Sequence, residues 1–417
     1  MPEEPVENLL PPLKTRRQYF DYLDRWTVGI VDDLKAHMTT RALVKAFLLE
    51  TSRVNGSRDV VTTLGSTRQD INQIDETLYR LRWSGEAADW ALIEVEDQRY
   101  PVLYTALKTD IANRRVDQLV HSSPFLDRAW FSAPMFQRLW QLVLDAYPGH
   151  RFSKIVFEHE SIYEAFAGDL MVSPDSEDER DEPKDDEDIL EVERRRARMQ
   201  ITERIGKLEK ALPKMRPEYD PLESIVSLRI PAPRRGGHDV YFDGRFTNRS
   251  DSMTSLRQTV ELVTNIYRYS TEMAENASWP QALDAATMEK PISLGKPILI
   301  KFSEELEIAT FERWMAALRR KNNRFRLWGN PIKLGPGKVH IYAVDNHLWQ
   351  PIDLEITQDH LYALLPYGTC GNTIHRLVTN IQQFIAPKLE IYIGDQKYED
   401  FIARAPTDRV DGGTFYG

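Results

Sequence analysis

The chain has 417 residues, of which 41% are hydrophobic and 28% are charged, which excludes a wholly disordered protein and allows about two or three globular domains. Its formal net charge is −10, but residues 175–188 (DSEDERDEPKDDED) alone carry a net −8, which leaves −2 on the other 403 residues. The globular part is nearly neutral, so net charge gives no support for nucleic-acid or membrane binding.

The sequence shows no sign of secretion or membrane insertion. Its one cysteine, Cys370, cannot form an internal disulfide, and the acidic start MPEEPVENLLPP lacks the basic and apolar regions of a signal peptide. No apolar run is long enough to cross a bilayer. We therefore expect a soluble, cytoplasmic protein without membrane contact.

The first part of the chain, residues 1–172, predicts a helical lead followed by a small α/β unit. Apolar residues from Tyr19 to Met38, at three- or four-residue spacing, predict a helix capped by Thr15. A second apolar run covers residues 42–49 of this helical lead. The pattern from Ile71 to Leu81 predicts a further helix.

The α/β unit begins where the pattern changes. Residues 89–107 predict two strands joined by a turn at Asp97–Arg99, and FSKIVFEH (152–159) predicts another strand. Between them, residues 125–147 predict a helix that is broken near Pro134.

An acidic segment without aromatic residues, 173–193, predicts a disordered linker or surface loop. The pattern from Val192 to Leu212 then predicts a helix ended by Pro213. The acidic segment folding back onto the basic run RRRAR is an alternative, and a solvated helix beside a solvated loop is favoured. Residues 224–246 predict two strands.

A strong amphipathic helix follows these strands, capped by Asp251 or Ser252 and apolar from Leu256 to Met273. The C-terminal elements have the clearest order, β-α-β-β-α-β, which is typical of a ferredoxin-like sandwich. Ser303 is the predicted cap of the first of its two helices. The expected elements are strand 297–302, helix 303–322, strands 338–344 and 351–357, helix 371–386 and strand 388–394.

The predicted fold class is therefore α+β, in a multidomain protein. The expected divisions are a helical lead with a small α/β unit (1–172), an acidic linker (173–193), a mainly helical region with a short strand pair (194–290), a ferredoxin-like α/β sandwich (291–405) and a flexible tail (406–417).

Common catalytic motifs are missing. The sequence contains no P-loop, no G-x-G-x-x-G, no G-x-S-x-G and no cysteine pair for zinc. HESIY (159–163) begins like a zinc-peptidase motif, but Tyr163 stands where the second imidazole ligand belongs. These absences argue against the common nucleotide hydrolases and zinc peptidases, and they leave unfamiliar enzymes open.

Cys370 lies in a glycine-containing turn before an amphipathic helix. The free N–H groups at such a helix start suit a phosphate, although a strand, a turn and a cap also explain the pattern. The helix start lowers a thiol pKa, but His375 would lie about 140° around an ideal helix from Cys370, so a packed structural thiol is favoured. The candidate anion ligands are Gly371, Asn372, Thr373 and Arg376.

Acidic and histidine side chains alternate with apolar ones on the C-terminal strands, so they are expected on the helix-free face of the sheet. Such a group could hold a hard divalent cation. Pairing of Lys301 with its carboxylate neighbours, or cover by another domain, is the favoured alternative. The candidate metal ligands are His340, Asp353, Glu355 and Glu390.

The same face argues against an RNA-recognition motif, because Asp353 and Glu355 on the presumed third strand would repel phosphates. A basic patch near Trp314, Phe325 and Trp328 is the alternative contact for single-stranded nucleic acid. A cation-rich helix end that needs no ligand is the simpler interpretation. The patch consists of Arg319, Arg320, Lys321, Arg324 and Arg326.

Together these patterns predict a non-catalytic interaction or assembly subunit of a soluble intracellular complex. A protein partner is expected, and nucleic acid is a further candidate partner. The alternative is a metal-dependent, nuclease-like phosphoester hydrolase that uses the acidic and histidine residues of the C-terminal domain. No cofactor is expected apart from that divalent metal ion.

Overall fold

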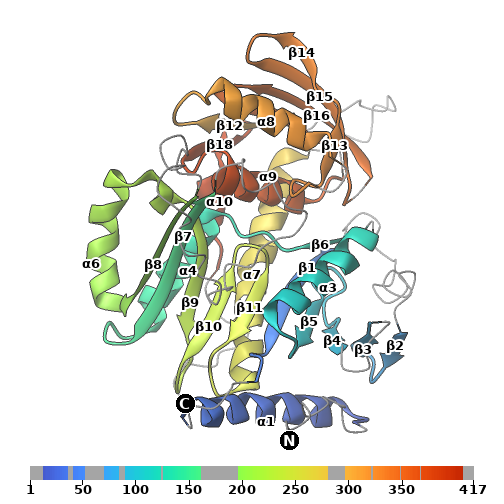
Figure 1. Ribbon diagram of the computed structural model, residues 1–417, viewed down its shortest axis with the longest axis vertical. Helices are drawn as coiled ribbons and strands as arrows, with labels where there is room; N and C mark the ends of the chain where they lie inside the picture. The colour runs from blue at the N-terminus through green and yellow to red at the C-terminus, as the bar shows by residue number, and fades with distance from the viewer. Residues whose placement is uncertain are drawn as a thin grey trace, which may run out of the picture.

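The computed structural model has an α+β fold built from two antiparallel sheets and the helices around them (Figure 1). The predicted acidic linker, Lys321 and residues 407–417 lie outside the part of the chain that the structure describes. The described residues are 13–35, 41–51, 70–83, 90–123, 125–160, 196–279, 296–320, 323–347, 349–366 and 368–406.

The first sheet has eleven described strands in the order β2-β3-β4-β5-β1-β11-β10-β9-β7-β8, with β6 paired to β1. Its strands are β1 (Lys45–Thr51), β2 (Asp70–Gln73), β3 (Leu78–Arg82), β4 (Trp90–Glu94), β5 (Val102–Thr105), β6 (Leu126–Arg128), β7 (Phe152–Glu160), β8 (Arg196–Arg204), β9 (Ile225–Pro231), β10 (Gly237–Tyr241) and β11 (Arg245–Asn248).

This sheet unites chain segments from both sides of the acidic segment. Strand β7 pairs with β8 and β9, and β1 pairs with β5 on one side and β11 on the other, all antiparallel. Residues 1–172 and 194–290, which the sequence pattern assigns to separate regions, therefore contribute strands to the same sheet.

Helices cover both faces of the first sheet. Along β1, Ala46 and Leu48 join the larger apolar core, while the alternate residues Phe47 and Leu49 join a smaller core beneath α3. The helices of this part are α1 (Arg16–Lys35), α3 (Thr109–Ser122), α4 (Ala133–Ala146), α6 (Ile205–Met215) and α7 (Met253–Ser278), with 3-10 turns η2 (Arg216–Glu218) and η3 (Asp220–Glu223). Among the described residues, no helix is long and apolar enough to cross a membrane.

Three predicted helical stretches are wrong. The apolar run 42–49 forms β1, the pattern 71–81 forms β2 and β3, and residues 196–204 form β8 before α6 begins. A strand that is buried on both faces, such as β1, has an unbroken apolar run, and periodicity cannot distinguish it from a buried helix segment.

Two further boundaries differ from the prediction. The expected helix 125–147 is the short strand β6 followed by α4, which accommodates Pro134 in its first turn, where no N–H partner is needed. The second strand expected in 224–246 is a hairpin of β10 and β11 that turns at Gly244, whose φ of 77° favours glycine.

Other predictions are confirmed. The strands expected in 89–107 are β4 and β5, and the strand at 152–159 is β7. The strong amphipathic helix is α7, and the Ser252 hydroxyl accepts the N–H of Ser255, as a helix cap does. Helix α7 runs along the first sheet and reaches the second (Figure 1).

The second sheet has eight described strands in the order β13-β15-β16-β17-β12-β18-β19, with β14 paired to β15. These are β12 (Ile298–Phe302), β13 (Leu327–Gly329), β14 (Ile332–Gly335), β15 (Lys338–Asp345), β16 (Gln350–Thr357), β17 (His360–Leu364), β18 (Leu389–Ile393) and β19 (Gln396–Lys397), with helices α8 (Ile308–Leu318), α9 (Gly371–Phe384) and α10 (Tyr398–Ala403).

The second sheet departs from the sequence pattern in two places. Helix α8 begins at Ile308 and not after Ser303, because Leu306 is bonded to the turn after β16 through its N–H and carbonyl, both to Gln358. Strand β17, which was not predicted, lies between β16 and β12. Strand β17 follows β16 after a tight turn. The apolar pattern continues across this turn, so the sequence does not mark where one strand ends and the next begins.

Helix α9 lies between the two sheets (Figure 1), and all fourteen of its residues are buried. Its apolar residues form the predicted face, but the opposite polar face is buried as well, against β7, α7 and the loops of the first sheet. Because a buried polar group is costly unless it is hydrogen-bonded, the polar side chains of α9 need partners in the first part of the chain.

Candidate functional site

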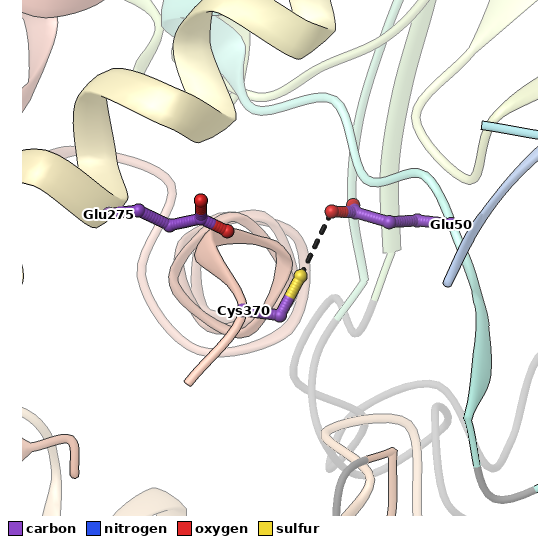
Figure 2. Close-up of side chains that lie close together, drawn as sticks. All are labelled: Glu50, Glu275 and Cys370. Carbon is purple, nitrogen blue, oxygen red and sulfur yellow. Dashed lines mark hydrogen bonds between the residues drawn. The ribbon is translucent and has the colours of Figure 1, made fainter. Parts of the chain in front are cut away.

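Three reactive side chains meet where α9 begins (Figure 2). Glu50 is the next-to-last residue of β1, Glu275 extends from α7, and Cys370 is the residue before α9. One oxygen or sulfur atom of each lies within 4.8 Å of the others, and all three side chains are buried. This constellation joins three positions that are far apart in the sequence.

Arg99 supplies the positive charge of this cluster. Its guanidinium donates to Glu50 at 2.9 Å and to Glu275 at 3.2 Å, and it lies 3.5 Å from the Cys370 sulfur. Burial raises the pKa of Glu50, and the charge of Arg99 opposes that rise. A cation of the protein itself therefore contacts both carboxylates.

Donors surround the Glu50 carboxylate on its remaining sides. The Tyr267 hydroxyl donates to it at 2.6 Å, the Asn372 amide at 3.0 Å and the Cys370 thiol at 2.9 Å. Hydrogen bonds of this kind to an ionised group are the strong ones. The cluster consequently ties β1, α7 and the start of α9 together.

Cys370 is in a poor state for nucleophilic chemistry. Burial and then the negative charge of Glu50 raise the pKa of its thiol, which outweighs the helix start. His375 does not reach it and accepts or donates a hydrogen bond with the Tyr398 hydroxyl at 2.8 Å. The geometry favours the packed structural thiol over the nucleophile.

We expect Cys370 in the native protein to react with a thiol reagent such as iodoacetamide at least about 100-fold more slowly than in the urea-unfolded chain, because modification requires an opening of the buried interface. Mass spectrometry of quenched samples measures both rates, and Cys370→Ser provides the blank. Equal rates in the two states would show that the thiol is accessible.

The four predicted anion ligands are brought together, and carboxylates of the chain occupy their donors. The Gly371 N–H donates to Glu275 at 3.0 Å, which places negative charge at the helix start. The Thr373 hydroxyl donates to Asp345 at 2.6 Å. A phosphate at this place stays a prediction, and it would have to displace these carboxylates.

Arg376, the fourth of these residues, is the centre of a second buried network. It donates to Asp345 at 2.7 Å, to the carbonyl of Phe325 at 2.8 Å and also to Asp127. Asp127 forms a further ion pair with Arg326 at 3.0 Å. Two arginines and two aspartates are thus paired between β6, the end of β15 and α9.

The predicted basic patch does not form one surface. Arg326 is buried in the network with Asp127, and half-buried Arg324 lies over the Phe384 ring at 4.5 Å. Arg319 and Arg320 are exposed at the end of α8. Of the described members, these two are the exposed ones.

The predicted metal ligands fall into separate groups. His340 contacts Asp353 at 3.1 Å, and Lys338 donates to Glu355 at 2.7 Å on the same two strands. Glu390 on β18 lies four strands from β15, about 19 Å at the usual strand spacing of about 4.8 Å. The four side chains therefore do not share one site.

The helix-free face of the second sheet is a separate candidate site. Its alternate residues are exposed or half-buried on β15, β16, β17, β12 and β18, while the others are buried. Tyr342 and Tyr362 are 60% and 39% exposed there. Asp353 and Glu355 lie on the expected strand 351–357, which is β16, but β17 with His360 and Tyr362 lies between that strand and β12.

Sequence patterns missed the acidic members of the buried networks. Glu50, Asp127 and Asp345 each lie at or beside the end of an apolar run, in FLLET, FLDRAWF and YAVD. A carboxylate within or next to an apolar run is the local signal that they share. Their arginine partners come from distant segments and have no such signal.

Comparison with known proteins gives a family match along most of the chain. The family model described as MJECL33-like protein matches residues 10–212 and 223–401. The uncharacterized protein MJECL33 of Methanocaldococcus jannaschii is 23% identical over 401 residues, which cover 91% of this chain and 94% of that protein.

Proposed function

Because the chain belongs to the MJECL33-like protein family, whose name states no activity, we propose a function from its geometry: a non-catalytic subunit that binds another protein on the helix-free face of the second sheet. The observation that carries this proposal is the concentration of exposed apolar side chains there. Of ten large apolar side chains exposed among the described residues, six belong to this sheet and its loops: Trp328, Ile332, Leu334, Tyr342, Trp349 and Tyr362.

Pairing registers support one continuous surface. Ile332 on β14 lies opposite His340 on β15, and His340 lies opposite Glu355 on β16. Glu355 in turn lies opposite Tyr362 on β17. Tyr362 in turn lies opposite Leu299 on β12, which is paired with Tyr392 on β18. Contiguous apolar patches on a folded protein mark binding sites, and aromatic side chains dominate the centres of protein interfaces.

The charges on this face favour a protein over a nucleic acid. Asp353 contacts His340, Glu355 contacts Lys338, and Glu390 lies opposite Lys301. These pairs leave the face close to neutral, whereas binding to a phosphate backbone depends on excess positive charge. A partner with its own apolar and aromatic patch fits this surface best.

The sealed state of the reactive groups supports a non-catalytic role. Glu50, Glu275 and Cys370 are buried and bonded to groups of the chain itself. Substrate would reach them only if the two sheets separated. The phosphoester hydrolase remains an alternative proposal, and the separation of Glu390 from His340 gives it no support.

We further infer that the second sheet is an elaborated ferredoxin-like sandwich. The segments β12, α8, β16, β17, α9 and β18 follow the β-α-β-β-α-β order. Strands β13, β14 and β15 then extend one edge, and Figure 1 shows β14 at the outer limit. The single buried cysteine suits the reducing cytoplasm proposed for the protein.

Replacing Tyr342 and Tyr362 together by glutamate is expected to weaken partner binding at least about 100-fold, because each buried tyrosine anchor contributes about 2 kcal/mol or more. Partners are first identified by quantitative mass spectrometry of affinity-purified complexes and then tested as pure proteins by calorimetry. Tyr219→Glu, which changes a 51% exposed tyrosine near the first sheet, is the matched control.

Loss of binding in the double variant, with retention in Tyr219→Glu and an unchanged melting temperature, supports the proposal. Unchanged binding of every pure partner contradicts it. Self-association that the double variant abolishes, measured by sedimentation, would identify a second copy as the occupant and would also contradict it.

A further inference from the structure

A positively charged cavity lies at one end of the first sheet. The start of β7, the end of β8 and the β9–β10 turn meet at this end. The volume of the cavity is about 300 Å³, and its lining includes His150, Arg151, Phe152, Arg229, Arg234 and Arg235. Among the described residues that line it, none carries a carboxylate. Four guanidinium groups around one cavity are a recurring arrangement for binding phosphate.

The turn that carries two of these arginines is firmly held. Arg151, the residue before β7, donates to the carbonyls of Ala232 and Pro233. Gly236 has a φ of 72°, and a Cβ there would lie 2.1 Å from the carbonyl oxygen of Arg249. The turn can therefore form only with glycine, and it fixes the backbone of Arg234 and Arg235 at the cavity.

Positive charge exceeds negative charge around this cavity. Buried Asp239 accepts from Arg229 at 2.6 Å and 3.0 Å, and it accepts from Arg249 at 2.6 Å as well. One carboxylate thus serves two arginines. Within the described part of the chain, neither Arg234 nor Arg235 has an ion pair, and both are exposed. An external anion could pair with Arg234 and Arg235.

An aromatic platform adjoins the arginines. Phe152 is 55% exposed, and the Arg204 guanidinium lies 5.8 Å from the centre of its ring. Bases of single-stranded nucleic acids and nucleotides stack on exposed aromatic rings of this kind beside cationic side chains. The combination of a cavity of about 300 Å³ lined by arginines with an exposed aromatic ring indicates the chemical class of the ligand.

We propose that this cavity binds the phosphate group of a nucleotide unit, with Arg234 and Arg235 as the principal charge partners and Phe152 as the stacking surface for the base. The site is separate from the helix-free face of the second sheet. It also differs from the predicted basic patch at the end of α8, from which it draws no residue.

The test is a titration of the full chain with inorganic phosphate, a mononucleotide and a short single-stranded oligonucleotide, at two salt concentrations. Arg234→Gln with Arg235→Gln is expected to weaken oligonucleotide binding at least about tenfold and to reduce the salt slope of log affinity by about 1.4, which is about 0.7 for each arginine replaced. Phe152→Ala is expected to weaken binding of the mononucleotide and the oligonucleotide but not of inorganic phosphate.

Arg319→Gln with Arg320→Gln removes the same charge from the end of α8 and is the matched control. Binding that survives in this control and weakens in the cavity variant supports the proposal. The proposal is overturned if the α8 variant weakens binding equally or more, if Phe152→Ala leaves nucleotide binding unchanged, or if no probe binds at the lower salt concentration.

Discussion

Replacing Arg376 by methionine is expected to lower the free energy of unfolding by about 3–5 kcal/mol, the usual cost of removing one partner from a buried ion pair. Asp345 would lose its 2.7 Å ion pair with Arg376 and keep the donors Thr373 and the His347 N–H. The negative charge of Asp345 would then remain buried with neutral hydrogen-bond donors alone. Urea unfolding followed by circular dichroism measures the change.

Two comparison variants make this prediction specific. Arg17→Met removes an exposed arginine that lies 3.6 Å from Asp21, and such surface pairs cost less than about 1 kcal/mol. Asp345→Asn, combined with Arg376→Met, removes both charges of the pair and should recover part of the loss. A cost below about 1 kcal/mol for Arg376→Met, or strict additivity in the double variant, would show that the network is not coupled.

The protein is expected to lose stability steeply as the pH falls from 6.5 toward 4. Burial lowers the pKa of His238 and His347 from 6.5 to about 4, and it lowers the pKa of His375 to about 3. Between pH 6.5 and 4 the unfolded chain binds more protons than the folded one. The free energy that the three neutral histidines contribute to stability is therefore present above pH 6.5 and is lost as the pH falls.

The expected loss of stability on acidification is large. Each histidine contributes about 2 kcal/mol of destabilisation between pH 6.5 and 5, because one pKa unit corresponds to about 1.4 kcal/mol. Three of them together approach the total stability of an ordinary domain, about 5–15 kcal/mol. At lower pH, protonation of Asp345, whose pKa is lowered by Arg376 against the opposing effect of burial, continues the loss.

Urea unfolding at a series of pH values measures this slope. His375→Phe should reduce it by about one third, because phenylalanine retains an aromatic ring beside Tyr267 and Tyr398 and binds no proton. Replacing exposed His121 by glutamine should leave it unchanged. A stability that is flat from pH 6.5 to 5 would contradict the prediction.

Local patterns were sufficient for elements that combine a clear period with a definite end, and for α7 a cap as well. Helix α7 with Ser252, helix α9, and strands β7, β12, β15 and β18 were predicted for this reason. Strand β8 was not, because Met199, Ile201 and Ile205 satisfy a loose helical period as well as strand alternation. Its pairing with β7 decides between the two.

The buried networks were beyond prediction for a different reason. Periodicity separates the apolar face of α9 from its polar face, but it does not reveal that β7 of the first sheet and helix α7 cover the polar face. Glu50 meets Cys370 across 320 positions of sequence, and Arg99 meets Glu275 across 176. The identities of such partners follow from the tertiary fold, which sequence patterns of neighbouring residues do not contain.

The pairing of β7 with β8 has a consequence for how the chain tolerates change. Glu160 and Arg196 are directly opposite each other in the register, so the ends of the intervening segment are fixed one strand spacing apart. Lengthening that segment adds little loop-closure cost, about 0.6 kcal/mol for each doubling. Because the register of Glu160 and Arg196 fixes both ends of the insertion point, a tag, a reporter domain or new chain ends placed between these strands is expected to preserve the eleven-stranded sheet.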